Sequence, residues 1–129
     1  MTDQPEDLRY TKTHEWVRVL ADCIEVGITD FAQEQLSDIT YIQLPQVPQH
    51  VRVNEEVLTL ESIKAASDVY APISGTIIEV HTELEKTPDL INSNPYTEGW
   101  LFRMELDDMK EVDALMSSKE YSATLQPEE

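Results

Sequence analysis

The residues that most often carry out chemistry in proteins stand here in patterns that do not support autonomous catalysis. The three histidines, His14, His50 and His81, have spacings that match no metal-binding pattern. The run HEWVR at residues 14–18 fails the two-histidine motif of zinc proteases, because its fifth position is Arg18. We therefore interpret each histidine as a surface or strand residue.

Phosphate-binding loops and activated nucleophiles find no support either. The chain has only 3 glycines, none near another, so a glycine-rich loop cannot form. There is no nucleophile elbow and no cysteine protease signature. Pairs such as Glu55 and Glu56 are expected by chance among 26 acidic residues, and we interpret them as a solvated face. We expect a protein that is not an enzyme.

The residue with the most interesting setting is Lys64. Ser62, Ala65 and Ala66 flank it with little bulk, and apolar strand patterns precede and follow it. Such a pattern predicts a hairpin with Lys64 at its tip. A rigid hairpin presents one amine in a fixed pose, which is what a modifying enzyme needs to select one lysine among several. A lysine that is merely solvated is the plainer alternative.

The elements around this hairpin follow from the hydrophobic pattern. Alternation predicts strands at 10–19, 23–28, 39–44 and 100–106, and two further strands, 51–60 and 69–80, that meet at the lysine tip. Gly27 suggests a bulge or a close approach, and Gly75 a tight turn. A short helix capped by Thr29 or Asp30, a capping box at 107–111 and a helix at 118–125 complete the prediction, with a disordered tail at 126–129.

Composition limits the possible partners. The 129 residues suit one domain with one core, and 26 Asp and Glu against 9 Lys and Arg give a net charge of −17. Nine basic groups among so many carboxylates cannot form a face for nucleic acid or anionic membranes. No run approaches the roughly 18 apolar residues of a membrane span. The first ten residues match neither a secretory nor a transit peptide, so we expect a cytoplasmic location.

Four separated motifs carry a specific resemblance. They are LESIKAASDVYAPISG at 60–75, YTKTHEW at 10–16, GITDFA at 27–32, and LIN, NPY and GWL at 90–92, 94–96 and 99–101. Together they closely resemble the H protein family of the glycine cleavage system, in the family's order, from about residue 10 to residue 125. A biotin carrier sets its lysine between methionines, and Ile63 and Ala65 stand here instead.

The resemblance implies a fold and a function. The fold would be mainly β, a barrel-sandwich hybrid of two small antiparallel sheets with short helices. It would form a single lipoyl-carrier domain over 1–129, with a core at about 10–106 and a C-terminal helical extension at about 107–125. Lys64 would carry lipoate covalently, and the recognition motif around it would comprise Glu61, Ser62, Ala65 and Asp68. Thr13, Glu15 and Asp68 would form the arm-docking cleft, with Glu15 facing the cationic cargo. From its place in the sequence, Asp68 could equally be a turn residue.

The implied partners are those of a shuttle. A pyridoxal phosphate-dependent glycine decarboxylase would load an aminomethyl group, a tetrahydrofolate-dependent aminomethyltransferase would remove it, and dihydrolipoamide dehydrogenase would reoxidise the dithiol. A lipoate-attaching enzyme would modify the chain. We expect a monomer, because a shuttle must leave each enzyme. Lipoylation would change the charge from 9 minus 26 to 8 minus 26, or −18, which suits salt-sensitive encounters with basic enzyme surfaces.

Two alternatives stay open. An H-like carrier could serve lipoate relay or another redox or acyl-transfer pathway with the same Lys64, or the chain could be an unmodified interaction domain.

Ser37, Pro48 and Asn54 stand where the family commonly has Gly. Proline fixes φ near −65°, so the turn at Pro48 should differ from the family's.

Overall fold

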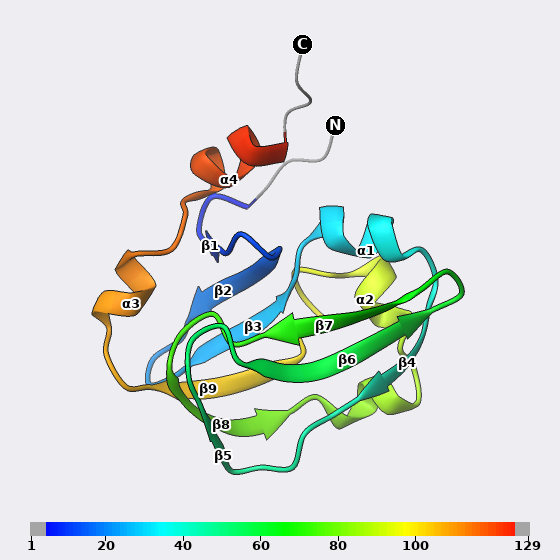
Figure 1. Cartoon of the computed structure of the whole chain (residues 1–129), viewed down its shortest axis with the longest axis horizontal. Coiled ribbons are helices and arrows are strands. Elements are labelled where there is room, and N and C mark those ends of the chain that lie inside the picture. The colour runs from blue at the N-terminus through cyan, green and yellow to red at the C-terminus, as the bar shows by residue number, and fades with distance from the viewer. Residues whose placement is uncertain (1–4, 126–129) are drawn as a thin grey trace.

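Two antiparallel sheets and several short helices make up the computed structural model, which describes residues 5–125 (Figure 1). The strands are β1 (Arg9–Tyr10), β2 (Glu15–Val19), β3 (Ile24–Ile28), β4 (Ile39–Gln43), β5 (Gln49–Val51), β6 (Glu56–Ser62), β7 (Ala66–Tyr70), β8 (Gly75–Val80) and β9 (Phe102–Leu106). The helices are α1 (Asp30–Leu36), the 3-10 helix η1 (Thr82–Glu85), α2 (Leu90–Ser93), α3 (Lys110–Asp113) and α4 (Ser118–Leu125). The predicted fold class is confirmed.

The sheets divide the chain into a larger and a smaller layer. The six-stranded sheet has the order β1-β2-β3-β9-β8-β5, and the three-stranded sheet has the order β4-β6-β7. The main core contains buried side chains from both, including Val17 and Phe102 of the larger sheet and Leu60 and Val69 of the smaller one. The hydrophobic alternation of the sequence thus becomes one apolar interior shared by two sheets.

Of the two explanations offered for Gly27, the structure supports a close approach to a neighbouring side chain and not a bulge. Gly27 pairs in regular register with Trp16, and a Cβ built on Gly27 would lie 2.6 Å from the Trp16 ring. Gly75 was expected in a tight turn, and this prediction is wrong. Gly75 is the first residue of β8, where a Cβ would lie 2.0 Å from the carbonyl oxygen of Glu105 on β9. Backbone packing therefore requires glycine there.

The predicted strands at the hairpin are each divided in two. The expected strand 51–60 splits into β5 and β6, and the expected strand 69–80 splits into β7 and β8. In both cases one half pairs in the smaller sheet and the other half in the larger sheet. The apolar runs continue across the breaks because the chain passes from one layer of the same core to the other. Hydrophobicity alone could not reveal that crossing.

The helix predicted at 118–125 is confirmed, but the capping box predicted at 107–111 is wrong. Helix α4 occupies the predicted range, while α3 is a single turn. The Asp108 carboxylate accepts from the Lys110 N–H at 3.0 Å. Glu111 does not close the box; its carboxylate accepts from the Ser74 N–H at 2.6 Å and so joins α3 to the bend before β8. The tail predicted to be disordered lies outside the described residues.

Two of the three positions that depart from the family's glycines keep a left-handed backbone. Ser37 has φ 68° and Asn54 has φ 70°, values that favour glycine. The third, Pro48, follows a cis peptide bond. Glycine-type geometry is therefore retained at Ser37 and Asn54 without glycine.

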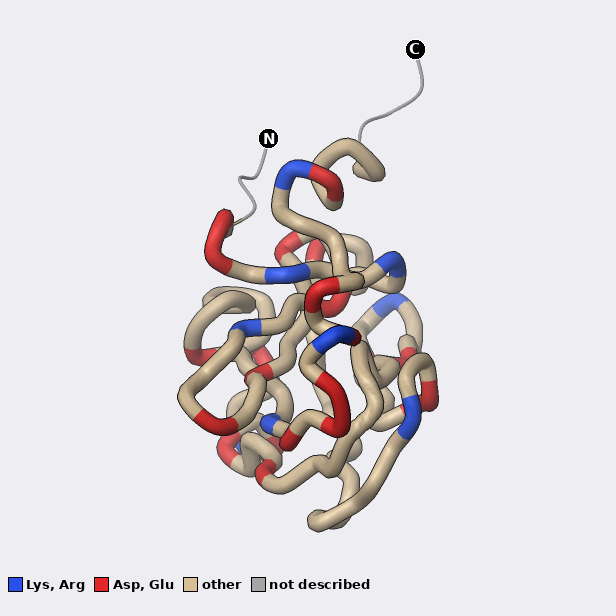
Figure 2. The backbone as a smooth tube through the Cα atoms, turned by 90° about the vertical axis from the view of Figure 1, so that its left-hand side faces the viewer, with Lys and Arg blue, Asp and Glu red and all other residues tan. Residues whose placement is uncertain are grey.

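Acidic residues are spread along the whole backbone trace of Figure 2, with fewer basic residues between them. Within residues 5–125 no helix is long and apolar enough to cross a membrane.

Candidate functional site

The lysine tip is a four-residue turn that Ser62 organises. The Ser62 N–H donates to the Ala65 carbonyl at 2.8 Å, and the Ser62 hydroxyl donates to the same oxygen at 3.1 Å. The hydroxyl oxygen also accepts from the N–H groups of Lys64 and Ala65, each at 3.1 Å. One side chain thus satisfies the backbone of the turn, as serine commonly does.

Lys64 lies in this turn, between β6 and β7, and the β6–β7 hairpin projects at the right-hand edge of Figure 1. Its side chain is exposed, and no ion pair recorded within residues 5–125 involves its ammonium. The turn is also anchored, because the Ile63 N–H donates to the Asp38 carbonyl at 3.1 Å. An accessible amine is therefore carried on a fixed backbone.

The other predicted recognition residues surround the tip on both strands. Glu61 is exposed near the end of β6 and pairs with Ala66. Ala65 closes the turn, and Asp68 lies on β7 opposite Thr59. Asp68 is thus a strand residue, and the alternative of a turn residue is wrong.

A cleft of about 260 Å³ runs beside the same hairpin. It is lined by residues of the segment leading into β2, of β3 and α1, and of β6 and β7: Thr13, His14, Glu15, Ile28, Phe31, Ala32, Gln35, Leu36, Leu60, Ser67, Asp68 and Val69. The three residues predicted for an arm-docking cleft, Thr13, Glu15 and Asp68, therefore line one cavity. Most of the remaining lining is apolar, which suits a hydrocarbon arm.

Glu15 is the buried charge of this cleft. Its residue is 1% exposed, and its Oε1 accepts from the hydroxyls of Thr11 and Thr13, each at 2.5 Å. Its Oε2 accepts from the Tyr70 N–H at 3.1 Å. A carboxylate offers about four acceptor positions, so three donors leave capacity for one more. That capacity is what a buried cation would require.

Asp68 is engaged differently. Its Oδ1 accepts from the Thr59 hydroxyl at 3.0 Å. The pKa of Glu56 is raised by a hydrogen bond to Asp68 and by the negative charge of that residue. Neither Thr59 nor Glu56 lines the cleft, so the Asp68 carboxylate already has partners outside it. Glu15 is the better candidate for a cation partner.

Sequence reasoning missed His14. It was interpreted as a surface or strand histidine, but it is a half-buried residue with φ 74° in the bend before β2, and it lines the cleft. Its ring packs against Phe31 at 4.8 Å, and Nδ1 is 2.7 Å from the Tyr121 hydroxyl. Burial lowers the pKa of His14, which favours a neutral ring. No pattern in the sequence linked residue 14 to residue 121.

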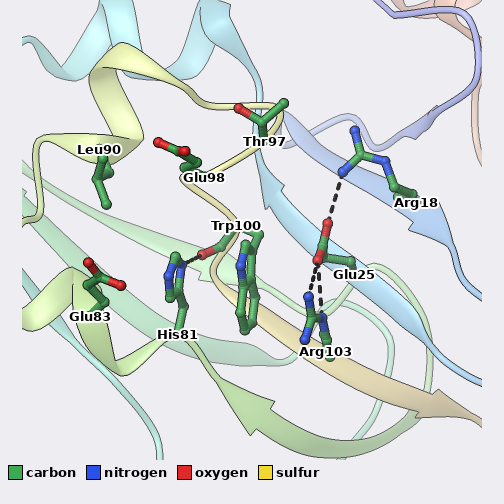
Figure 3. Close-up of a pocket in the computed structure, with 9 residues that line it drawn as sticks. All are labelled: Arg18, Glu25, His81, Glu83, Leu90, Thr97, Glu98, Trp100 and Arg103. Carbon is green, nitrogen blue, oxygen red and sulfur yellow. Dashed lines mark hydrogen bonds and ion pairs between the residues drawn. The ribbon is translucent and has the colours of Figure 1, made fainter.

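A larger cavity of about 530 Å³ lies over the six-stranded sheet, and its charged groups mostly bind one another (Figure 3). The nearly buried Glu25 accepts from Arg18 at 2.9 Å and from Arg103 at 2.8 Å. Trp100 lies between His81, stacked at 4.3 Å, and the Arg103 guanidinium at 4.1 Å. These contacts join β2, β3 and β9, so we assign them a structural role.

Within residues 5–125 no group of three or more His, Cys, Asp or Glu side chains could hold a metal ion. The site combines one exposed amine on a fixed turn with an apolar cleft that contains a buried carboxylate.

The comparisons with known proteins agree on one family. Residues 8–128 match the family model described as Glycine cleavage H-protein. A glycine cleavage system H protein of Thermus thermophilus is 48% identical over 126 residues, covering 98% of each chain. One of Coprothermobacter proteolyticus is 51% identical over 117 residues, covering 90% of this chain and 92% of the relative. The crystal structure of a Mycobacterium marinum glycine cleavage system H protein superposes with TM-score 0.86 and 36% identity, covering 95% of this chain and 98% of that one.

Proposed function

The chain belongs to the glycine cleavage H-protein family, and from this premise we propose that Lys64 is its lipoyl attachment residue. The protein is a lipoyl carrier of the glycine cleavage system. The single observation that carries the assignment to Lys64 is its exposed position at the Ser62-organised tip of the β6–β7 hairpin. Glu61, Ser62, Ala65 and Asp68 would present this tip to the lipoate-attaching enzyme.

The cleft beside the hairpin fits the arm. Leu60 of β6 and Val69 of β7 line it, so the hairpin that presents Lys64 also forms a wall of the cavity. A bound lipoyl group would supply the dithiol that accepts and releases the aminomethyl group. The chain would supply the tether, the apolar wall and the carboxylate of Glu15, which has room for one further donor.

Thr13 lies beside that carboxylate: it is exposed, whereas Glu15 is buried, and its hydroxyl donates to Oε1 together with the hydroxyl of Thr11. A cationic amine would therefore bind Oε2, to which, within the described residues, only the Tyr70 N–H donates. Asp68 would act mainly in presenting the hairpin, since its carboxylate is held by Thr59.

The partners belong to the same proposal. They are the pyridoxal phosphate-dependent glycine decarboxylase, the tetrahydrofolate-dependent aminomethyltransferase, dihydrolipoamide dehydrogenase and a lipoate-attaching enzyme. The carrier would be a monomer that catalyses no step itself. We further propose one domain over residues 1–129, with its core at about 10–106 and an extension at about 107–125, because Val112 of the extension is buried in the main core.

Intact-mass spectrometry tests the assignment. The chain is produced with lipoate and a lipoate ligase, beside Lys64→Arg and the control Lys86→Arg, in which an exposed lysine outside the hairpin is changed. We expect one lipoyl addition in the wild type and in Lys86→Arg, and none in Lys64→Arg. An addition that persists in Lys64→Arg would refute the assignment.

A further inference from the structure

Helix α4 packs against the protein through one buried residue, which contacts the surroundings of the cleft. Tyr121 is the buried residue of this helix and is 0% exposed. Its ring stacks on Tyr10 with centroids 4.7 Å apart and an angle of 6° between the planes. Tyr121 does not line the cleft, but its hydroxyl contacts His14, which lines the cleft, and Thr29, which precedes α1.

The hydroxyl joins two elements. It lies 2.7 Å from Nδ1 of His14, before β2, and 2.7 Å from Oγ1 of Thr29, at the start of α1. With one proton it donates to one partner and accepts from the other, and either arrangement satisfies both contacts. Burial raises the pKa of Tyr121, which keeps this proton in place.

Both partners of the Tyr121 hydroxyl, His14 and Thr29, contact further residues that line the cleft. Thr29 caps α1 by accepting from the Ala32 N–H at 3.3 Å, and its own N–H donates to the His14 carbonyl at 3.0 Å. The His14 ring packs on Phe31. His14, Phe31 and Ala32 line the cleft, and Glu15 follows His14 directly.

We propose that Tyr121 is a positioning residue for the arm-docking cleft, because its hydroxyl holds His14 and the start of α1 in fixed relation and so sets the cleft wall beside Glu15. This inference rests on the proposed function of the cleft. The C-terminal helix is then part of the carrier's working site, although it contributes no lining residue.

A competing explanation is that Tyr121 only stabilises the buried aromatic cluster. Tyr121→Phe keeps the ring stack and removes the hydroxyl. Tyr10→Phe is the matched control, because it removes from the same cluster a hydroxyl that donates at 2.6 Å to the Pro5 carbonyl, away from the cleft. A stabilising role predicts similar effects of both changes, whereas a positioning role predicts different ones.

The first measurement uses the chain without lipoate. Amide hydrogen exchange at Thr29 and Ala32 and the ring nitrogen shifts of His14 are followed by NMR. We expect exchange at both amides to rise roughly fivefold in Tyr121→Phe, with an altered His14 ring signal, and to stay near the wild-type value in Tyr10→Phe. Equal changes in both variants, or none in Tyr121→Phe, would overturn the proposal.

The second measurement uses the lipoylated protein loaded by the glycine decarboxylase. We expect the lifetime of the loaded protein to shorten roughly fivefold in Tyr121→Phe and not in Tyr10→Phe. His14→Asn provides the test from the other side of the hydrogen bond if Tyr121→Phe does not fold, since Asn tolerates the left-handed backbone. It should shorten the lifetime similarly, and an unchanged lifetime would count against positioning. If Lys64 is never lipoylated, the proposed function fails, while the exchange measurement still decides the role of Tyr121.

Discussion

The carboxylate of Glu15 on β2 accepts a hydrogen bond from the backbone N–H of Tyr70 on β7 at 3.1 Å, and so a buried charge joins the two sheets. The same residue is proposed to receive the cationic cargo. A mutation at Glu15 is therefore expected to change both the stability of the protein and the binding of the cargo, and the two effects must be measured separately.

Glu15→Ala removes the acceptor of three donors, two threonine hydroxyls and the Tyr70 N–H. We expect the free energy of unfolding to fall by about 3 kcal/mol, since bonds to charged groups are stronger than neutral ones. Glu15→Gln should lose about 1 to 2 kcal/mol, because the amide still accepts from the threonines but sets its NH₂ against the Tyr70 N–H. Urea unfolding measures both values.

Glu15→Gln also tests the cargo role with less loss of stability. We expect lipoylation at Lys64 to proceed normally and the lifetime of the loaded protein to shorten about tenfold, because the carboxylate's negative charge is gone. Glu15→Ala should behave similarly in direction. Release of the amine over time is the measurement, and Glu55→Gln, a surface change, is the control. An unchanged lifetime in Glu15→Gln would remove the cation-binding role.

Ser62→Ala should slow modification of the tip without unfolding the protein. The hydroxyl satisfies the Lys64 and Ala65 N–H groups, so its removal loosens the turn that presents the amine. We expect kcat/KM of the lipoate ligase to fall about fivefold to tenfold, while the exposed site costs little stability. Ser93→Ala on α2 is the matched control, because this exposed serine lies outside both the hairpin and the cleft. Equal rates for both variants would contradict the role of Ser62.

His14 should make stability depend on pH in a defined window. Burial lowers its pKa in the folded protein below the ordinary 6.5. As the pH falls below 6.5, the unfolded chain takes up a proton that the folded chain resists, so the free energy of unfolding decreases; above 6.5 both states are neutral and this contribution is constant. His14→Asn lacks the effect. Measured by urea unfolding from pH 7.5 to about pH 5, the free energy of unfolding should fall more steeply in the wild type than in His14→Asn. Parallel curves for the two proteins would contradict this role of His14.

Association with the glycine decarboxylase should weaken as salt is added. The chain carries a net charge of −17, and amide formation at Lys64 would leave 8 minus 26, or −18. Opposite charge on a partner speeds encounter, and salt screens it. We expect the association rate to fall several-fold between about 0.05 and 0.5 M salt, with a smaller change in the dissociation rate. A rate indifferent to ionic strength would exclude steering by this charge.

The predicted strands and helices came from local signals, and the misplaced breaks show what such signals lack. Alternation located β3 and β9, and the Thr29 cap located α1, because each depends on neighbouring residues. The strand predicted at 10–19 is only partly right, since β1 ends at Tyr10 and β2 begins at Glu15. The breaks between β5 and β6 and between β7 and β8 depend on which layer each half joins. Gly75 illustrates the same limit: a side chain at this position is excluded by the Glu105 carbonyl, which is 30 positions away in the chain.

The candidate site divides in the same way. Lys64 and Ser62 form a local turn, and the sequence motif was enough to predict it. The family resemblance predicted that Thr13, Glu15 and Asp68 form one cleft. In the structure, all three residues line the same cavity. The contact of His14 with Tyr121 spans 107 positions and rests on one hydroxyl, for which no local pattern exists.

The two ends of the described chain are joined by a backbone bridge: the N–H of Tyr10 donates to the Met116 carbonyl at 2.8 Å, and the N–H of Met116 donates to the Tyr10 carbonyl at 2.9 Å. During synthesis, the lysine hairpin is complete once β7 has emerged, because its bonds are local. The contacts that hold Tyr10 and His14 can form only after Met116 and Tyr121, which lie C-terminal to the hairpin, have been synthesised. If Lys64 is the modified residue, as proposed, its hairpin would thus be present on the growing chain before the contacts that set the cleft wall at His14 can form.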